Sequence, residues 1–141
     1  MPTSKARVYV HLVWTTVERR PLISEEVSGS LCRWLHRVVR DLGCKLVAVS
    51  CLTDHVHLLI RMSHLRSISE IVRRLKGSSS HFLNKEFGEE EWFRWQRGYG
   101  AFSVSRWDVA RVAKYIRNQK QHHSDGTEVG SLEPDVTDSE G

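Results

Sequence analysis

The sequence predicts an α+β domain whose elements follow the order β-α-β-β-α-β, with one extra helix near the C-terminus. Three observations predict this class. Short runs rich in β-branched and aromatic residues alternate with longer segments in which apolar residues recur at helical spacing. Serine and aspartate residues suited to capping precede the helical segments. Two strand runs are separated only by a short turn, which indicates an antiparallel hairpin.

The first half of the chain begins with a strand over residues 7–15, a run rich in β-forming residues. A helix is predicted over about residues 25–42, because Ser24 is a good N-cap and Gly43 can end the helix. Alternate residues of the strand share a face, with Val8, Val10, Leu12 and Trp14 on one side and Tyr9, His11 and Val13 on the other.

The second half begins with the hairpin, whose strands are predicted over residues 44–51 and 54–60. Ser67 and Glu70 have the spacing of a capping box, so a second helix is expected to start there. The last two elements are a strand over residues 101–105 and a helix over about residues 108–122, capped by Ser105 and Asp108.

This order of elements is the split-βαβ, ferredoxin-like plan. In that plan the first and third strands are central neighbours, and two helices cover one face of the sheet. Antiparallel sheets can leave the other face open. We expect that open face to carry His11, His55 and His57.

The totals favour one domain in a reducing compartment. The chain has 141 residues, enough for one core, and its apolar runs are far too short to span a membrane. The first residues lack a signal-peptide pattern. Three cysteines without CxxC spacing argue against a zinc ribbon or a disulfide scaffold. A cytoplasmic protein with no membrane partner is expected.

The charge distribution divides the chain in two. Residues 124–141 hold six acidic residues and no lysine or arginine, so the +10 charge of residues 1–123 exceeds the +4 of the whole chain. We expect residues 1–123 to form the folded domain and residues 124–141 a disordered acidic tail. A strongly basic domain favours a polyanionic partner, although a basic protein without such a partner remains an alternative.

Two histidines in the third strand are the first candidate site. In Asp54-His55-Val56-His57, strand alternation puts both imidazoles on one face of the sheet. Two neutral imidazoles side by side are half of a metal site. The alternative is a pair of solvated histidines. Asp54 could orient one imidazole, or it could be an ordinary turn residue.

The last helix offers a second group of residues. Tyr115 and Gln119 are one helical turn apart, so both can face one site. We place Tyr115 off the apolar stripe of this helix, where a core tyrosine is not expected. The alternative is an exposed amphipathic helix with an ordinary tyrosine. The stripe consists of Val109, Val112, Ala113 and Ile116.

Together these residues predict phosphate chemistry. His55, His57 and the Gln119 carbonyl form a nitrogen and oxygen donor set that suits Mg²⁺ or Mn²⁺. Tyr115 would attack phosphorus and form a phosphotyrosine. Positive charge from the metal and from Lys114 or Arg111 would favour the phenolate. Further candidate phosphate contacts, each of which could instead be a solvated side chain, are Arg73, Arg74, Lys76, Arg94 and Arg97. Trp92 and Trp95 could stack bases or belong to the core.

The motifs resemble the HUH-superfamily single-tyrosine transposases of small bacterial insertion sequences (the IS200-like family). The resemblance extends from about residue 8 to residue 123. It is carried by residues 10–14 (VHLVW), 54–57 (DHVH), 75–79 (LKGxS), 95–99 (WQxGY) and 115–119 (YIRNQ). Relatives commonly continue past the tyrosine helix with structured residues, whereas this chain has an acidic tail.

The resemblance implies a function. Members cut and rejoin single-stranded DNA at element ends that fold into hairpins, through a tyrosine linked to a 5′-phosphate. It implies Tyr115 as the nucleophile and His55, His57 and Gln119 as metal ligands. It also implies a homodimer in which the tyrosine helix can be supplied in trans. Two alternatives stay open: an HUH nickase of the replication-initiator or domesticated repeat-associated type, and a non-catalytic single-strand nucleic-acid binding module.

Overall fold

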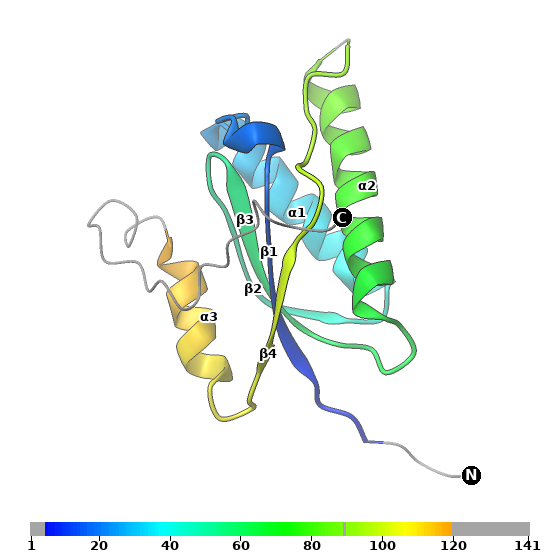
Figure 1. Ribbon diagram of the computed structural model, residues 1–141, viewed down its shortest axis with the longest axis vertical. Helices are drawn as coiled ribbons and strands as arrows, with labels where there is room; N and C mark the ends of the chain where they lie inside the picture. The colour runs from blue at the N-terminus through cyan, green and yellow to red at the C-terminus, as the bar shows by residue number, and fades with distance from the viewer. Residues whose placement is uncertain (1–4, 89, 120–141) are drawn as a thin grey trace.

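The computed structural model describes residues 5–88 and 90–119, which form a four-stranded antiparallel sheet with three α-helices (Figure 1). The strand order is β2-β3-β1-β4, so the first and third strands are central neighbours as predicted. The α+β, ferredoxin-like class is therefore confirmed. The strands are β1 (Tyr9–Thr15), β2 (Lys45–Cys51), β3 (His55–Arg61) and β4 (Gly100–Val104). The helices are α1 (Glu25–Asp41), α2 (Ile68–Phe87) and α3 (Val109–Arg117), with a short 3₁₀ segment η1 (Val17–Arg19).

Local sequence signals explain both ends of α1 and the start of α2. The Ser24 side chain accepts a hydrogen bond from the Val27 amide at the start of α1. Ser67 does the same for the Glu70 amide at the start of α2. After α1 the chain turns at Gly43, whose φ of +78° favours glycine.

The predicted cap of the last helix is wrong in detail. Asp108 is the N-cap of α3, but its side chain makes no capping hydrogen bond within the described residues. The Ser105 hydroxyl instead accepts from the Trp107 amide and closes the turn before the helix. Helix α3 ends at Arg117 with Asn118 as its C-cap, earlier than the predicted end near residue 122. Residues 120–122 and the predicted tail, residues 124–141, lie outside the described residues.

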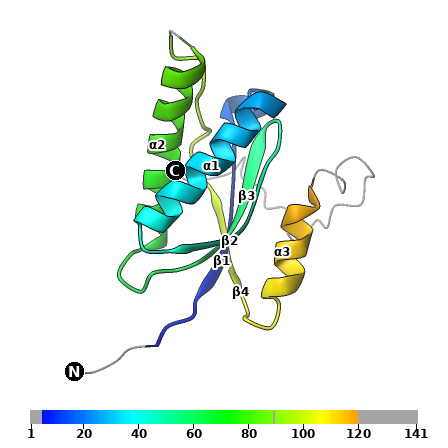
Figure 2. The ribbon, with the colours of Figure 1, turned by 180° about the vertical axis from the view of Figure 1, so that it is seen from behind.

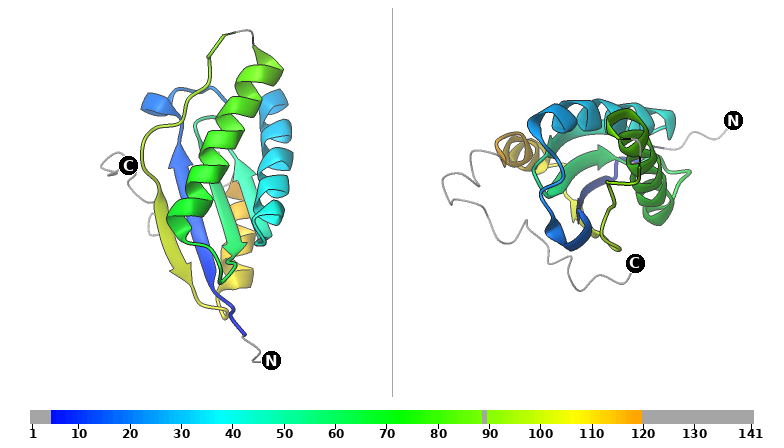
Figure 3. Two further views of the ribbon diagram at one scale, coloured as in Figure 1. Left: turned by 90° about the vertical axis from the view of Figure 1, so that its right-hand side faces the viewer. Right: turned by 90° about the horizontal axis from the view of Figure 1, so that it is seen from above.

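One face of the sheet is covered by α1 and α2, which pack side by side (Figures 2 and 3). The sheet contributes the alternate apolar residues of its two central strands to this core, as their spacing predicts. Each of these side chains is almost completely buried: Val10, Leu12, Trp14, Val56, Leu58 and Ile60.

The opposite face is not open, which corrects the expectation from the sequence. Helix α3 packs across β2 and β3 on this side (Figure 1). A second, smaller apolar cluster joins Ala48 and Leu59 of the sheet to Val112, Ala113 and Ile116 of the helix. The last helix therefore belongs to the same folded unit as the sheet it covers.

Tyr115 belongs to this second cluster and is only 6% exposed. The placement of Tyr115 off the buried stripe was therefore wrong. The buried stripe of α3 includes Tyr115 beside its apolar residues, and Gln119, just past the end of the helix, is also buried.

Candidate active site

The two histidines of β3 lie on the face covered by α3. His57 is opposite Val13 and His55 is opposite Thr15 in the antiparallel ladder with β1. Both are buried, and their ring centroids are 5.0 Å apart. Alternation along the strand predicted this common face, and the structure confirms that the two rings are adjacent.

His11 adds a third imidazole from β1. Its Nε2 lies 2.9 Å from Nδ1 of His57, and the two rings stack with centroids 5.2 Å apart. One of these nitrogens must donate and the other accept, so the pair fixes the tautomers of both rings together. His11 therefore orients the His57 ring within the buried layer.

Helix α3 brings the phenol of Tyr115 to the histidines, and Gln119, two residues past the end of the helix, adds the amide. The Tyr115 ring meets the His57 ring edge-on with centroids 6.3 Å apart. Nε2 of Gln119 lies 3.3 Å from the Tyr115 hydroxyl oxygen, at donating distance, and Gln119 is completely buried. The four residues that the sequence groups together thus lie together within one chain.

A carboxylate and a guanidinium extend the site beyond the imidazoles. Oδ1 of Asp54 lies 2.7 Å from Nδ1 of His55, and Nε of Arg19 lies 3.4 Å from Oδ2 of Asp54. Burial alone would raise the pKa of Asp54. The hydrogen bond with His55 and the positive charges of His55 and Arg19 outweigh burial, so the pKa lies below its ordinary value of 3.8.

Arg19 is the residue of this site that sequence reasoning missed. The only signal was the basic turn after the first strand, which includes Arg19 and Arg20. Nothing in that turn shows which arginine faces Asp54, because the choice depends on the backbone conformation of the turn.

The donor set suits a divalent cation. His55, His57 and Gln119 offer two imidazole nitrogens and a carboxamide oxygen on the same buried face. In residues 5–88 and 90–119, no three histidine, cysteine or acidic side chains surround one point. A third ligand would therefore come from the Gln119 amide, a neutral oxygen donor compatible with Mg²⁺ or Mn²⁺.

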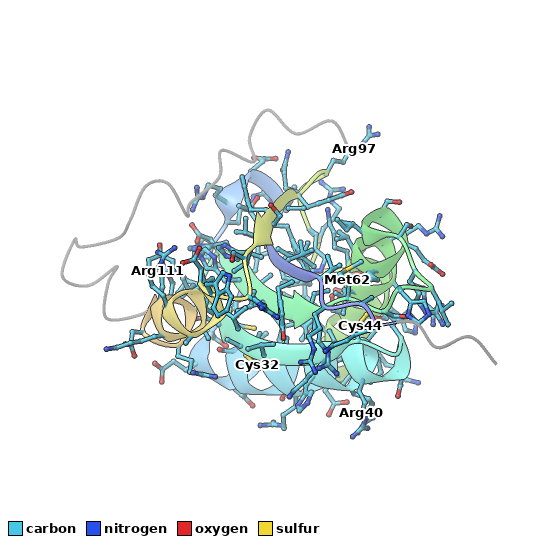
Figure 4. All side chains as sticks on the ribbon, turned by 90° about the horizontal axis from the view of Figure 1, so that it is seen from below. Cys32, Arg40, Cys44, Met62, Arg97 and Arg111 are labelled. Carbon is cyan, nitrogen blue, oxygen red and sulfur yellow. The ribbon has the colours of Figure 1, made fainter. Side chains whose placement is uncertain are left out.

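The predicted phosphate contacts do not form a single patch. Arg111 and Lys114 are exposed on α3, the helix that carries Tyr115. Arg73, Lys76 and Arg97 line a separate groove of about 830 Å³ between α2 and the segment before β4. Figure 4 shows Arg97 and Arg111 well apart at the molecular surface. The two remaining candidates, each exposed, are Arg74 and Arg94.

Lys76 makes hydrogen bonds within the protein. Its Nζ donates to the backbone carbonyls of Gln96 and Gly98 at 2.7 and 2.9 Å. Burial lowers the pKa of Lys76 from 10.5 to about 8. The ammonium therefore anchors the segment before β4 to α2. Trp95 also packs inward, edge-on against Trp14, which favours the core interpretation of this tryptophan.

Comparisons with known proteins agree with this site. The family model "Transposase IS200 like" matches residues 4–119. The chain is similar to the ISDra2 transposase TnpA of Deinococcus radiodurans, with 29% identity over 82% of this chain and 89% of the relative. It is also similar to the transposase for insertion sequence element IS200 of Salmonella typhimurium, with 26% identity over 84% and 81%.

Two solved structures share the fold. One, described as a transposase from Deinococcus radiodurans, has a TM-score of 0.67 and 28% identity over 84% of this chain and 98% of that chain. The other is a REP-associated tyrosine transposase bound to a REP hairpin, with a TM-score of 0.63 and 15% identity over 91% and 76%. No helix in the described parts of the chain is long and apolar enough to cross a bilayer. Since the family model spans most of the chain, the protein belongs to the IS200-like family of HUH-superfamily tyrosine transposases, which move mobile DNA elements.

Proposed function

We propose that this transposase cleaves and rejoins single-stranded DNA at the ends of an insertion sequence through a covalent 5′-phosphotyrosine. One observation carries the proposal. Tyr115 lies edge-on to His57, with Gln119 within hydrogen-bonding distance of its hydroxyl, although Tyr115 follows His57 by 58 residues in the sequence. A phenol buried against imidazoles can serve as the nucleophile for phosphoryl transfer.

His55, His57 and Gln119 would hold a divalent cation, Mg²⁺ or Mn²⁺. When bound, such a cation supplies positive charge that stabilises the charge developing on the phosphate oxygens. Asp54 holds the Nδ1 side of the His55 ring at 2.7 Å, which leaves Nε2 as the ligand atom. His11 contacts Nδ1 of His57 in the same way.

In the cleavage step, the Tyr115 oxygen forms a bond to phosphorus while the bond from phosphorus to the 3′-oxygen breaks. The tyrosine loses its proton, and the departing 3′-oxygen gains one. Gln119 orients the phenol through its amide, and Lys114 and Arg111 supply nearby positive charge on α3. The phosphotyrosine retains the bond energy, so a 3′-hydroxyl can attack it and rejoin DNA without ATP.

The expected partners are single-stranded DNA with hairpin ends and a second copy of the chain. A relative with the same fold is bound to a REP hairpin, which supports hairpin recognition. Within one chain α3 already covers the histidine pair. In a homodimer the same helix could complete the partner's site in trans, provided that it leaves its own sheet.

The test uses purified protein, Mg²⁺ and single-stranded DNA carrying the element's end hairpin. The wild-type protein should form an adduct that survives a denaturing gel, and Tyr115→Phe should form none. Tyr99→Phe is the matched control, because Tyr99 packs against the other core and should keep the adduct. An adduct that persists in Tyr115→Phe would contradict the proposal.

A second assay separates the transposase from the alternatives. Adding a strand with a free 3′-hydroxyl to the adduct should release the protein and yield joined DNA. A nickase would cleave without efficient joining to a second element end. A binding module would form no adduct at all, and histidines instead of base-stacking aromatics at positions 55 and 57 argue against it.

A further inference from the structure

The turn after β1 contains the most strained backbone in the described part of the chain. Glu18 and Arg19 are consecutive residues with φ of 53° and 54°, a backbone region that residues other than glycine rarely adopt. Such strain persists only where the surrounding structure holds it, and it gathers at functional sites. The strained conformation of this turn therefore raises two questions: which contacts hold it, and which side chains it positions.

Several hydrogen bonds hold the turn in this conformation. The Glu18 amide donates to Oε1 of Gln96 at 2.9 Å, and the Val17 amide donates to the Arg94 carbonyl at 2.9 Å. Thr16 is completely buried, and its hydroxyl is within 2.6 Å of the Arg20 carbonyl. The turn is thus fixed from both ends and from a neighbouring segment.

The same turn is tied to the residue before the histidine strand. The Thr16 amide donates to the Asp54 carbonyl at 2.9 Å, and the Thr16 hydroxyl lies 3.2 Å from the same oxygen. This places Nε of Arg19 3.4 Å from Oδ2 of Asp54, while Oδ1 faces His55 at 2.7 Å. Each carboxylate oxygen of Asp54 therefore has its own partner.

Stability does not explain this arrangement. The side chains of Arg19 and Asp54 are 49% and 27% exposed, and ion pairs at such sites contribute little to folding. A strained turn that ends in a weak ion pair is better explained by the orientation it gives to Asp54. The carboxylate lies directly against a proposed cation ligand.

We propose that Arg19 is a positioning residue that acts through Asp54 on His55. By holding Oδ2, it turns Oδ1 toward Nδ1 of His55, so this nitrogen carries the proton and Nε2 faces the cation. The inference rests on the proposed function, because it concerns the cation ligands of that site. It adds Arg19 to the hydrogen-bonded pair of Asp54 and His55.

The first measurement is the affinity of the full-length protein for Mn²⁺, by calorimetry without DNA. Arg19→Ala should weaken binding by about tenfold, the lower end of the effect of removing an outer-shell partner. Arg20→Ala is the matched control, because Arg20 lies in the same turn but contacts Glu18 instead of Asp54. It should bind Mn²⁺ like the wild type.

A double-mutant cycle shows whether Arg19 acts through the carboxylate. Asp54→Asn should weaken Mn²⁺ binding more than Arg19→Ala, and adding Arg19→Ala to Asp54→Asn should cause no further loss. An equal loss in both backgrounds would overturn the inference. Thermal melting of each variant checks that the fold is kept.

A readout without metal completes the test. In the metal-free protein, long-range ¹H–¹⁵N spectra should show the proton of His55 on Nδ1, and Arg19→Ala should shift protonation toward Nε2. If Arg19→Ala changes neither Mn²⁺ affinity nor the tautomer while wild type forms the DNA adduct, this inference fails and the proposed function stands. If wild type neither binds Mn²⁺ nor forms the adduct, both fail.

Discussion

The two faces of the sheet differ in what they bury. The face under α1 and α2 is mainly apolar and forms the large core, with Ser79 of α2 as a buried polar exception. The face under α3 buries three imidazoles, a phenol and a carboxamide beside a small apolar cluster. Residues on the two sides alternate along β3, so His57 and Leu58 are sequence neighbours with opposite environments.

This difference indicates a division of labour within one sheet. Apolar burial on the first face supplies most of the free energy of folding, because buried apolar area dominates stability. Buried polar groups on the second face need partners and cost stability unless they are satisfied. A single sheet thus supports a reactive layer because its other side is packed so completely.

The largest expected effect comes from His57→Ala, which removes a group from the reactive face. DNA cleavage should fall by about a thousandfold or more, equal to roughly 4 kcal/mol of transition-state stabilisation. Binding of single-stranded DNA should stay close to wild type. The measurement is adduct formation in parallel with a binding titration. An equal loss of both would mean that His57 serves only the fold.

Leu58→Ala tests the other face at the next residue. Leu58 is completely buried, so its truncation should lower the free energy of unfolding by about 2–5 kcal/mol. Cleavage per folded molecule should stay near wild type at low temperature. Denaturant unfolding and an adduct assay measure the two quantities. A stable Leu58→Ala protein with no activity would remove the contrast between the faces.

Ile116→Ala loosens the small cluster that holds α3 to the sheet. Because α3 is the last helix of the described residues and joins the sheet through a small cluster, it can detach locally, so the free energy of global unfolding should fall by less than about 2 kcal/mol. Amide exchange within α3 should speed up by more than exchange in β3. Adduct formation should fall in proportion to the detached population. Uniformly faster exchange across the chain would show that α3 does not move separately.

A pH-dependent effect on stability is expected from Lys76, a half-buried cation on the side of α1 and α2. The pKa of Lys76 is lowered to about 8 in the folded protein, so between pH 8 and 10.5 the unfolded chain binds more protons at this group. Its contribution to stability should therefore rise as pH increases through that interval. Lys76→Met removes this contribution. As pH rises from 8 to 10.5, the free energy of unfolding of wild type should therefore increase relative to that of the variant. A pH-independent difference would contradict the prediction.

Much of the fold could be predicted because its signals are local. Period-two alternation placed His55 and His57 on one face, and the serines at 24 and 67 marked where helices begin. Each of these features depends on residues within one turn or one strand. The same locality explains the hairpin, whereas the central pair of strands, β1 and β3, was predicted from the ferredoxin-like order of elements.

The features that escaped prediction depend on packing between distant segments. The apolar stripe of α3 has only a few residues, so its contact with β2 and β3 could not be read from the helix alone. The inward turn of Lys76 depends on two carbonyls in a loop twenty residues away. The role of Arg19 depends on a left-handed turn that its sequence does not favour. The burial of Tyr115 results from the contact of α3 with β2 and β3.

The short connection between β4 and α3 limits where a tyrosine helix can go. Five backbone steps separate Val104 from Val109, which span at most about 18 Å when fully extended. Exchange of α3 between two copies would first have to open the turn that Ser105 and Asp108 form. The histidine pair of a partner that accepts the helix must then lie close to the end of β4 in the chain that donates it. Only dimers that meet near this end of the sheet can therefore exchange their tyrosine helices.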